Sequence, residues 1–113
     1  MNTYEIPRNQ WPTLVTAFGE RHLGWRVSLD ILGEEIGAQP EIDGLPLEGI
    51  SAEPVSTGGS VSIFVEKSLD DHLTHLIQRP VAIRVAEDNN GVDSMQISAA
   101  DGTITVVTLA PPE

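Results

Sequence analysis

The chain has 113 residues and no cysteine, and its 17 acidic and 6 basic side chains give a formal net charge of −11. A chain of this length builds one core, so residues 1–113 are expected to form a single domain. The negative charge disfavours nucleic acid and anionic membranes as partners. Without cysteine there are neither disulfides nor thiolate sites, which agrees with a reducing compartment. The opening MNTYEIPRNQ lacks a signal-peptide pattern and no apolar run approaches the roughly 20 residues of a membrane span, so the sequence predicts a cytoplasmic protein.

The clearest predicted helix runs from Asn9 to His22, after an N-terminal segment of residues 1–8. Apolar residues recur there at spacings of three and four, which gives a helix one buried face. These residues are Trp11, Leu14, Val15 and Phe18. Asn9 is the expected N-cap, and Gly24 suits the left-handed conformation that closes a helix.

Beyond Gly24 the apolar residues alternate with polar ones, as in half-buried strands. This alternation runs from Trp25 to Ile31 and returns around residues 61–65, 81–85, 95–97 and 104–106. The turn sequences EDNNG at 87–91 and ADG at 100–102 predict tight hairpins. The last three strands are therefore expected to form an antiparallel meander, followed by a flexible tail at 110–113.

The segment between Gly33 and Gly59 contains six glycines, with both ends counted, and three prolines. Such a composition predicts short bent strands and turns rather than long elements. The fold class predicted for the whole chain is α+β. The N-terminal helix is expected to pack on a strongly bent antiparallel sheet or small β-barrel of about six strands.

Several short motifs, in a fixed order, resemble those of a bacterial family of small proteins that is classed as a domain of unknown function. The motifs are IPRNQW, HLGW, GLPLEGI and DHLTHLIQRP, and a hairpin around ADG follows them. The resemblance covers nearly the whole chain and implies a compact single domain in a bacterial protein without an export signal. It implies no activity, no cofactor and no catalytic residue.

Residues 69–77, LDDHLTHLI, place Asp71, His72 and His75 close together in a chain that has three histidines. On a helix, residues three or four apart are neighbours, so a pair of these side chains could hold a metal ion. On a strand, His72 and His75 point to opposite faces, and Asp71 stands about 13 Å from His75. The leucine spacing fits either structure, whereas the SLDD turn signal and Pro80 favour the strand. Asp71, His72 and His75 are then expected to be polar surface or structural residues rather than metal ligands.

Other polar groups have simpler interpretations than a binding site. Asp88–Asp93 resembles a calcium loop, but its glycine is at the fourth position and the twelfth is alanine, so a hairpin turn is preferred. The pairs Glu34–Glu35 and Glu41–Asp43 could carry acid–base chemistry, yet a solvated acidic surface explains them. Trp11 and Trp25 are expected in the core rather than around a ligand pocket.

The chain contains no GxSxG, GxxxxGK[ST], GxGxxG or HExxH motif. No catalytic residue is therefore assigned and no cofactor is expected. The preferred function is a non-enzymatic protein-interaction or self-associating module, whose partner is a basic protein or a second copy in a homodimer. An edge strand such as Val61–Val65 would make this contact. The alternative is a divalent-metal or small-molecule binding protein that uses Asp71, His72 and His75.

Overall fold

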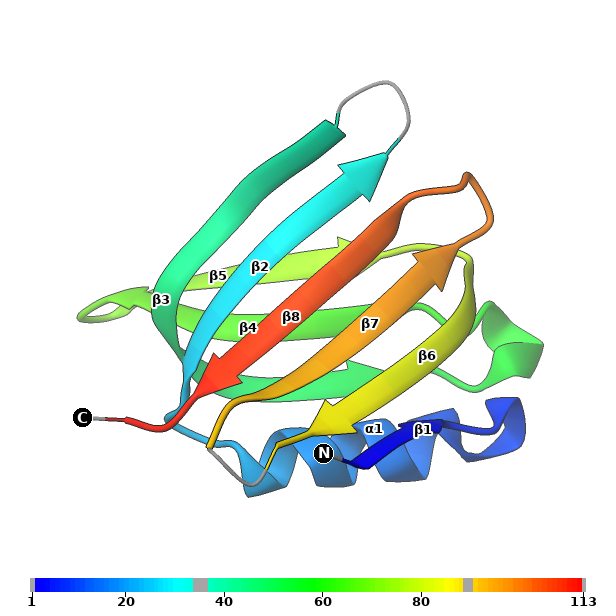
Figure 1. Cartoon of the computed structure of the whole chain (residues 1–113), viewed down its shortest axis with the longest axis horizontal. Coiled ribbons are helices and arrows are strands. Elements are labelled where there is room, and N and C mark those ends of the chain that lie inside the picture. The colour runs from blue at the N-terminus through cyan, green and yellow to red at the C-terminus, as the bar shows by residue number, and fades with distance from the viewer. Residues whose placement is uncertain (1, 34–36, 89–90, 113) are drawn as a thin grey trace.

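The computed structural model describes residues 2–33, 37–88 and 91–112. Within these ranges the chain forms one α-helix and an eight-stranded antiparallel sheet of order β1-β6-β7-β8-β2-β3-β4-β5 (Figure 1). The elements are β1 (Asn2–Glu5), the 3₁₀ helix η1 (Arg8–Gln10), α1 (Trp11–Arg21), β2 (Arg26–Gly33), β3 (Gly37–Ala52), the 3₁₀ helix η2 (Val55–Thr57), β4 (Val61–Ser68), β5 (Asp71–Ile77), β6 (Pro80–Glu87), β7 (Asp93–Ala99) and β8 (Ile104–Ala110). None of the helices in these ranges is long and apolar enough to cross a membrane.

The α+β class is confirmed, but the sheet has eight strands where the sequence predicted about six. One strand that the apolar alternation did not reveal is β1. All four of its residues are exposed, so it has no buried face to mark it. Its pairing partner is β6, with Tyr4 opposite Val85. The second addition is β5, whose sequence fitted either a helix or a strand.

Strand β3 is the longest element, with 16 residues, so the prediction of only short elements between Gly33 and Gly59 was wrong. The glycines bend this strand instead of ending it. Gly44 adopts a positive φ of 71°, and the register shifts between Leu47 and Gly49. Residues up to Pro46 pair with β2, and residues from Leu47 onward pair with β4. One strand therefore belongs to two layers of the fold.

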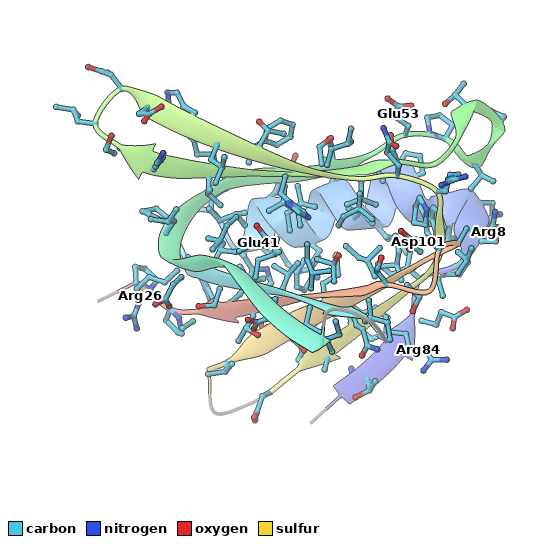
Figure 2. The ribbon with its side chains drawn as sticks, turned by 90° about the horizontal axis from the view of Figure 1, so that it is seen from above. Arg8, Arg26, Glu41, Glu53, Arg84 and Asp101 are labelled. Atoms are coloured by element: carbon cyan, nitrogen blue, oxygen red, sulfur yellow. The ribbon has the colours of Figure 1, made fainter. Side chains whose placement is uncertain are left out.

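The bend in β3 folds the sheet over on itself. One layer holds β1, β6, β7, β8, β2 and the first part of β3, and the other holds the second part of β3, β4 and β5 (Figure 1). Helix α1 lies along one side of the space between the layers (Figure 2). Its buried residues Trp11, Val15 and Phe18 join the apolar inner faces of the strands in one core. Gly19 lets the helix approach closely, because a Cβ atom there would stand 2.8 Å from the backbone nitrogen of Ile50.

The predicted helix is confirmed, with a different start. Residues Arg8–Gln10 form a 3₁₀ turn, and α1 begins at Trp11 with Gln10 at the N-cap position and no side-chain capping bond. Asn9 lies inside the 3₁₀ turn, so the predicted N-cap was wrong. Gly24 does adopt a left-handed φ of 82° after the helix.

The predicted meander of β6, β7 and β8 is confirmed. Its turns contain Gly91 and Gly102, both at positive φ. Asn89 and Asn90 lie outside the described residues. Strand β4 is paired with β3 on one side and β5 on the other, so the prediction that Val61–Val65 is an edge strand was wrong. The edges of the sheet are β1 and β5.

Candidate functional site

The histidine-rich segment is a strand, since Asp71–Ile77 forms β5 and pairs antiparallel with β4. His72 lies opposite Glu66, is exposed, and its Nδ1 stands 2.8 Å from Oε2 of Glu48. His75 lies opposite Ile63 and is half-buried. Residues three apart on a strand point to opposite faces, so the two imidazoles do not converge.

Asp71 is exposed at the start of β5, four residues before His75. The fold therefore brings neither this carboxylate nor His72 to His75. Across residues 2–33, 37–88 and 91–112, no group of three or more His, Cys, Asp or Glu side chains is placed to hold a metal ion. The predicted metal ligands Asp71, His72 and His75 would need groups from another molecule to complete a coordination shell.

A pocket of about 300 Å³ opens between the two layers, on the side away from α1. We call it the interlayer pocket. Its lining includes Ile31 of β2, His75 of β5 and Thr105 of β8. The turn residues Arg79, Asp101 and Thr103 also line it. These residues come from three strands and from the turns after β5 and β7. Figure 2 looks down on this side of the molecule, with Glu41 and Asp101 labelled between the layers.

Thr105 is the most buried polar residue of this pocket, with 4% of its surface exposed. It pairs with Ile31 on β2 and Ile97 on β7, so its side chain faces inward with theirs. The Thr105 hydroxyl has no hydrogen-bond partner among the described residues. Every fully buried side-chain oxygen or nitrogen of these residues does have a partner, so the hydroxyl oxygen of Thr105 is not fully buried. The hydroxyl of Thr105 therefore reaches the pocket.

His75 is the second polar group that faces the pocket without a hydrogen-bond partner in the described chain. Burial lowers the pKa of its imidazole below 6.5, and the nearby Glu41 carboxylate opposes this effect. Burial thus favours the neutral form of the His75 imidazole. A neutral imidazole offers one lone pair and one N–H to a ligand.

The rim of the pocket carries charges of both signs. Asp101 accepts hydrogen bonds from the backbone N–H of Thr103 at 3.0 Å and from its hydroxyl at 2.7 Å. These two bonds, with a smaller contribution from the charge of Arg79, lower the pKa of the Asp101 carboxyl. Arg79 has a left-handed φ of 52°, and its carbonyl accepts the backbone N–H of Ala100. The β5–β6 and β7–β8 turns are thus tied together beside the pocket.

Exposed leucines gather along β5, next to this pocket. Leu69 is 87% exposed, Leu73 37% and Leu76 51%. Leu73 shares the inward face with His75 and Ile77, whereas Leu76 lies on the outer face. An edge strand with exposed apolar side chains on both faces is a site where another chain can pair.

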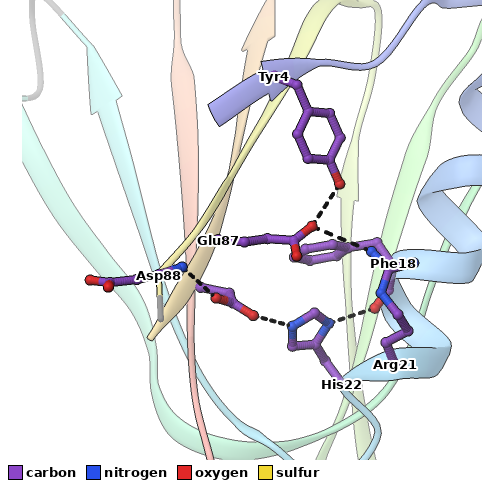
Figure 3. Close-up of polar contacts among 7 residues, drawn as sticks. Tyr4, Phe18, Arg21, His22, Glu87 and Asp88 are labelled. Carbon is purple, nitrogen blue, oxygen red and sulfur yellow. Dashed lines mark hydrogen bonds and ion pairs between the residues drawn. The ribbon is translucent and has the colours of Figure 1, made fainter. Parts of the chain in front are cut away.

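A second polar cluster is buried at the end of α1 (Figure 3). His22 is 2% exposed and packs between the rings of Phe18 and Trp25. Its Nδ1 lies 2.7 Å from the carbonyl oxygen of Phe18, and its Nε2 lies 2.7 Å from Oδ2 of Asp93. The other carboxylate oxygen of Asp93 accepts the backbone N–H of Asp88 at 2.9 Å.

This arrangement gives His22 a structural role. Both ring nitrogens are occupied and the ring is buried, so neither nitrogen can accept a proton from a substrate. The cluster joins the C-terminal end of α1 to the β6–β7 turn. Nearby, the Tyr4 hydroxyl donates to Oε1 of Glu87 at 2.7 Å, and Arg21 lies 3.6 Å from the same oxygen. Burial, and then this bond, raise the pKa of Tyr4.

The remaining predicted candidates fall in different places. Glu34 and Glu35 lie outside the described residues. Glu41 and Asp43 are both exposed on β3, and only Glu41 is placed beside His75. Trp11 is buried in the core, where its Nε1–H donates to the carbonyl of Ile6. Trp25 is partly buried and packs against the core, in agreement with the prediction.

Sequence patterns indicated His75 but not Thr105, Arg79 or Asp101 of the pocket. Thr105 lies in the alternating segment 104–106, where the polar residue of the alternation is expected on the outer face. Its inward orientation follows from its pairing with Ile31 and Ile97, and pairing between distant strands is not visible in one sequence. His22 was named only as the end of the predicted helix, and its partner Asp93 is 71 residues away.

The fold, the interlayer pocket and the buried cluster around His22 define a small α+β domain with an open edge strand. The chain belongs to the family described as "Family of unknown function (DUF5335)", whose model matches residues 2–113. The resemblance seen in the motifs is thereby confirmed. A protein of Aquifex aeolicus (strain VF5), named only as uncharacterized, is 27% identical over 111 residues, covering 98% of this chain and 95% of the relative. No solved structure matches the chain.

Proposed function

We propose that the protein is a non-enzymatic interaction module that binds an extended basic segment of a partner protein as an additional strand on β5. The observation that carries this proposal is the free edge of β5 with its exposed leucines. Backbone groups along a free edge can form a new ladder with an incoming strand, and alternate side chains then give specificity.

The other free edge fits this role less well. Strand β1 has only four residues, NTYE, without an exposed aliphatic side chain. Its Tyr4 is bonded to Glu87, and Glu5 lies 3.4 Å from Arg84. Strand β5 is longer, with seven residues, and presents Leu73 and Leu76 to solvent. An incoming strand would therefore meet exposed aliphatic side chains on β5 and none on β1.

Charge favours a basic partner over a second copy. The chain carries −11 formal charges, so two copies repel each other before contact. Carboxylates of Glu66, Asp70 and Asp71 lie on or beside β5, and none of the three is ion-paired among the described residues. A basic segment would be attracted to this edge, with a faster association rate at low ionic strength.

The test uses a peptide of alternating lysine and valine with the same length as β5, and isothermal titration calorimetry. We expect it to bind the full chain. The same peptide with N-methyl groups on alternate residues should bind at least about tenfold more weakly, because it has lost the ladder hydrogen bonds. A glutamate–valine peptide should not bind.

A matched pair of variants locates the contact. Leu76→Lys places a positive charge on β5 and should weaken binding of the lysine–valine peptide about tenfold. Leu23→Lys makes the same change at a side chain of similar exposure, 54%, beyond the end of α1, and should leave affinity unchanged. Equal affinities for the methylated and unmethylated peptides would contradict the proposal, and so would equal losses of affinity in the two variants. A dimer formed without peptide would replace the basic partner by a second copy.

The metal-binding alternative with Asp71, His72 and His75 stays a prediction. His72 already contacts Glu48, and His75 faces the interlayer pocket, so the three side chains have separate surroundings. A thermal shift with one divalent ion that is lost in His75→Ala would support this alternative, because an ion that binds only the folded state raises its stability.

A further inference from the structure

We infer that the interlayer pocket binds a primary ammonium group, supplied by a lysine side chain of the segment that docks on β5. The inference rests on the proposed docking and names the chemistry that the docked strand must carry. It concerns the space between the layers, beyond the backbone edge itself.

The position of the pocket relative to β5 supplies the first argument. Leu73, His75 and Ile77 face inward from β5, and the pocket begins at His75 and Ile77. A strand added to the free edge would extend the same layer across the open side of the molecule. Its alternate side chains would then point inward, toward Thr105 and Ile31 of the opposite layer.

The second argument is the unpaired hydroxyl of Thr105. This residue is 96% buried, by difference from its 4% exposure, and its side chain faces the pocket. The hydroxyl reaches the pocket and has no partner among the described residues, so it is open to a ligand. It can accept a hydrogen bond from an N–H or O–H group of that ligand.

The charges around the opening select a cation. Glu41, which is exposed on β3, acts electrostatically on His75 and has no ion-pair partner among the described residues. At the rim, the opposite charges of Asp101 and Arg79 balance each other, which leaves the Glu41 carboxylate in excess. An anion would be repelled by this carboxylate and by the field of a chain with net charge −11.

The acceptors around the pocket suit an ammonium group. An ammonium has three N–H donors and no acceptor. Acceptors at the pocket and its opening include the hydroxyl of Thr105, the imidazole of His75 and the carboxylate of Glu41. The aliphatic part of a lysine side chain would contact Ile31 and Ile77, which also line the pocket.

The first experiment tests the pocket without a peptide. The probe is n-butylammonium, which carries the end of a lysine side chain, titrated into the ¹⁵N-labelled full chain. We expect amide shifts that saturate at His75 and Thr105, and none with n-butanol or butyrate. Glu41→Gln and Thr105→Val should each weaken this binding about tenfold. Glu53→Gln removes the same charge from an exposed residue outside the pocket and should not.

The second experiment replaces each lysine of the lysine–valine peptide in turn by norleucine, which lacks only the amine. Replacement at one inward position should weaken binding about tenfold in the wild type and much less in Thr105→Val. Peptide binding that no replacement weakens, together with no response to n-butylammonium, would overturn the inference while the docking proposal stands. If the protein binds n-butylammonium saturably but does not bind the peptide, the docking is overturned and the pocket is a site for free amines.

Discussion

His22 carries a hydrogen bond on each ring nitrogen, to the Phe18 carbonyl and to the Asp93 carboxylate. Both partners are acceptors. For both bonds to form, one proton must lie on Nδ1 of His22 and a second between its Nε2 and the Asp93 carboxylate. The ring also fills the space between Phe18 and Trp25. One buried residue thus combines packing, polar pairing and the connection of α1 to the β6–β7 turn.

Replacing His22 by alanine should therefore destabilise the protein by about 2–4 kcal/mol, because it leaves a cavity and removes the partner of Oδ2 of Asp93. Urea unfolding followed by circular dichroism measures this change. His72→Ala is the matched control, since the His72–Glu48 pair is exposed and contributes about 0–1 kcal/mol. Equal losses in the two variants would contradict the structural role of His22.

His75 should make stability depend on pH. Burial lowers its pKa in the folded state below the unfolded value of 6.5. The unfolded chain therefore binds more protons in this range, and the contribution of His75 to stability is complete above pH 6.5 and is lost as pH falls through the lowered pKa.

Urea unfolding of wild type and His75→Gln between neutral and mildly acidic pH tests this prediction. The difference between the two proteins removes the contribution of the carboxylates. Wild type should lose more stability than the variant as pH falls. A difference that is constant with pH, or that changes in the opposite direction, would show that His75 is not desolvated in the folded state.

At the scale of elements, the contact of α1 with β3 depends on Gly19. Alanine is the better helix former by about 1 kcal/mol, so an exposed glycine in a helix is improved by this replacement. At Gly19 the new methyl would stand 2.8 Å from the nitrogen of Ile50 and 3.1 Å from its Cβ. The crowding should outweigh the helix propensity.

Gly19→Ala is thus expected to lower the free energy of unfolding by about 1–3 kcal/mol. Glu20→Ala, at the exposed neighbouring position, should change it by less than about 0.5 kcal/mol. Thermal unfolding of both variants gives the comparison. A stabilised Gly19→Ala would mean that α1 lies farther from β3 than the structure shows.

The elements that the sequence predicted are those with a regular buried face. The periodicity of Trp11, Val15 and Phe18 sufficed for α1, and the alternation in β6, β7 and β8 sufficed for the meander. Strand β3 was missed because its glycines bend the chain between two layers, an effect that depends on partners on both sides. In the candidate site, His75 was noticed as a residue type, whereas its proximity to Thr105 and Glu41 arises only when the layers meet.

At the scale of the whole molecule, the net charge of −11 should govern association with the basic peptide. Affinity for the lysine–valine peptide is expected to fall as salt rises, because the Debye length shortens from about 10 Å at 0.1 M to about 3 Å at 1 M. The methylated peptide should show the same salt dependence at lower affinity. Salt-independent binding would mean that apolar contacts alone hold the segment.

The central claim is that β5 is the edge on which a partner strand pairs. Amide hydrogen exchange of the full chain, with and without the lysine–valine peptide, tests it most directly. We predict that the peptide slows exchange at β5 and leaves β1, the other edge of the sheet, unchanged. Slower exchange at β1 with none at β5, or no change at either edge in a peptide-bound sample, would contradict the claim.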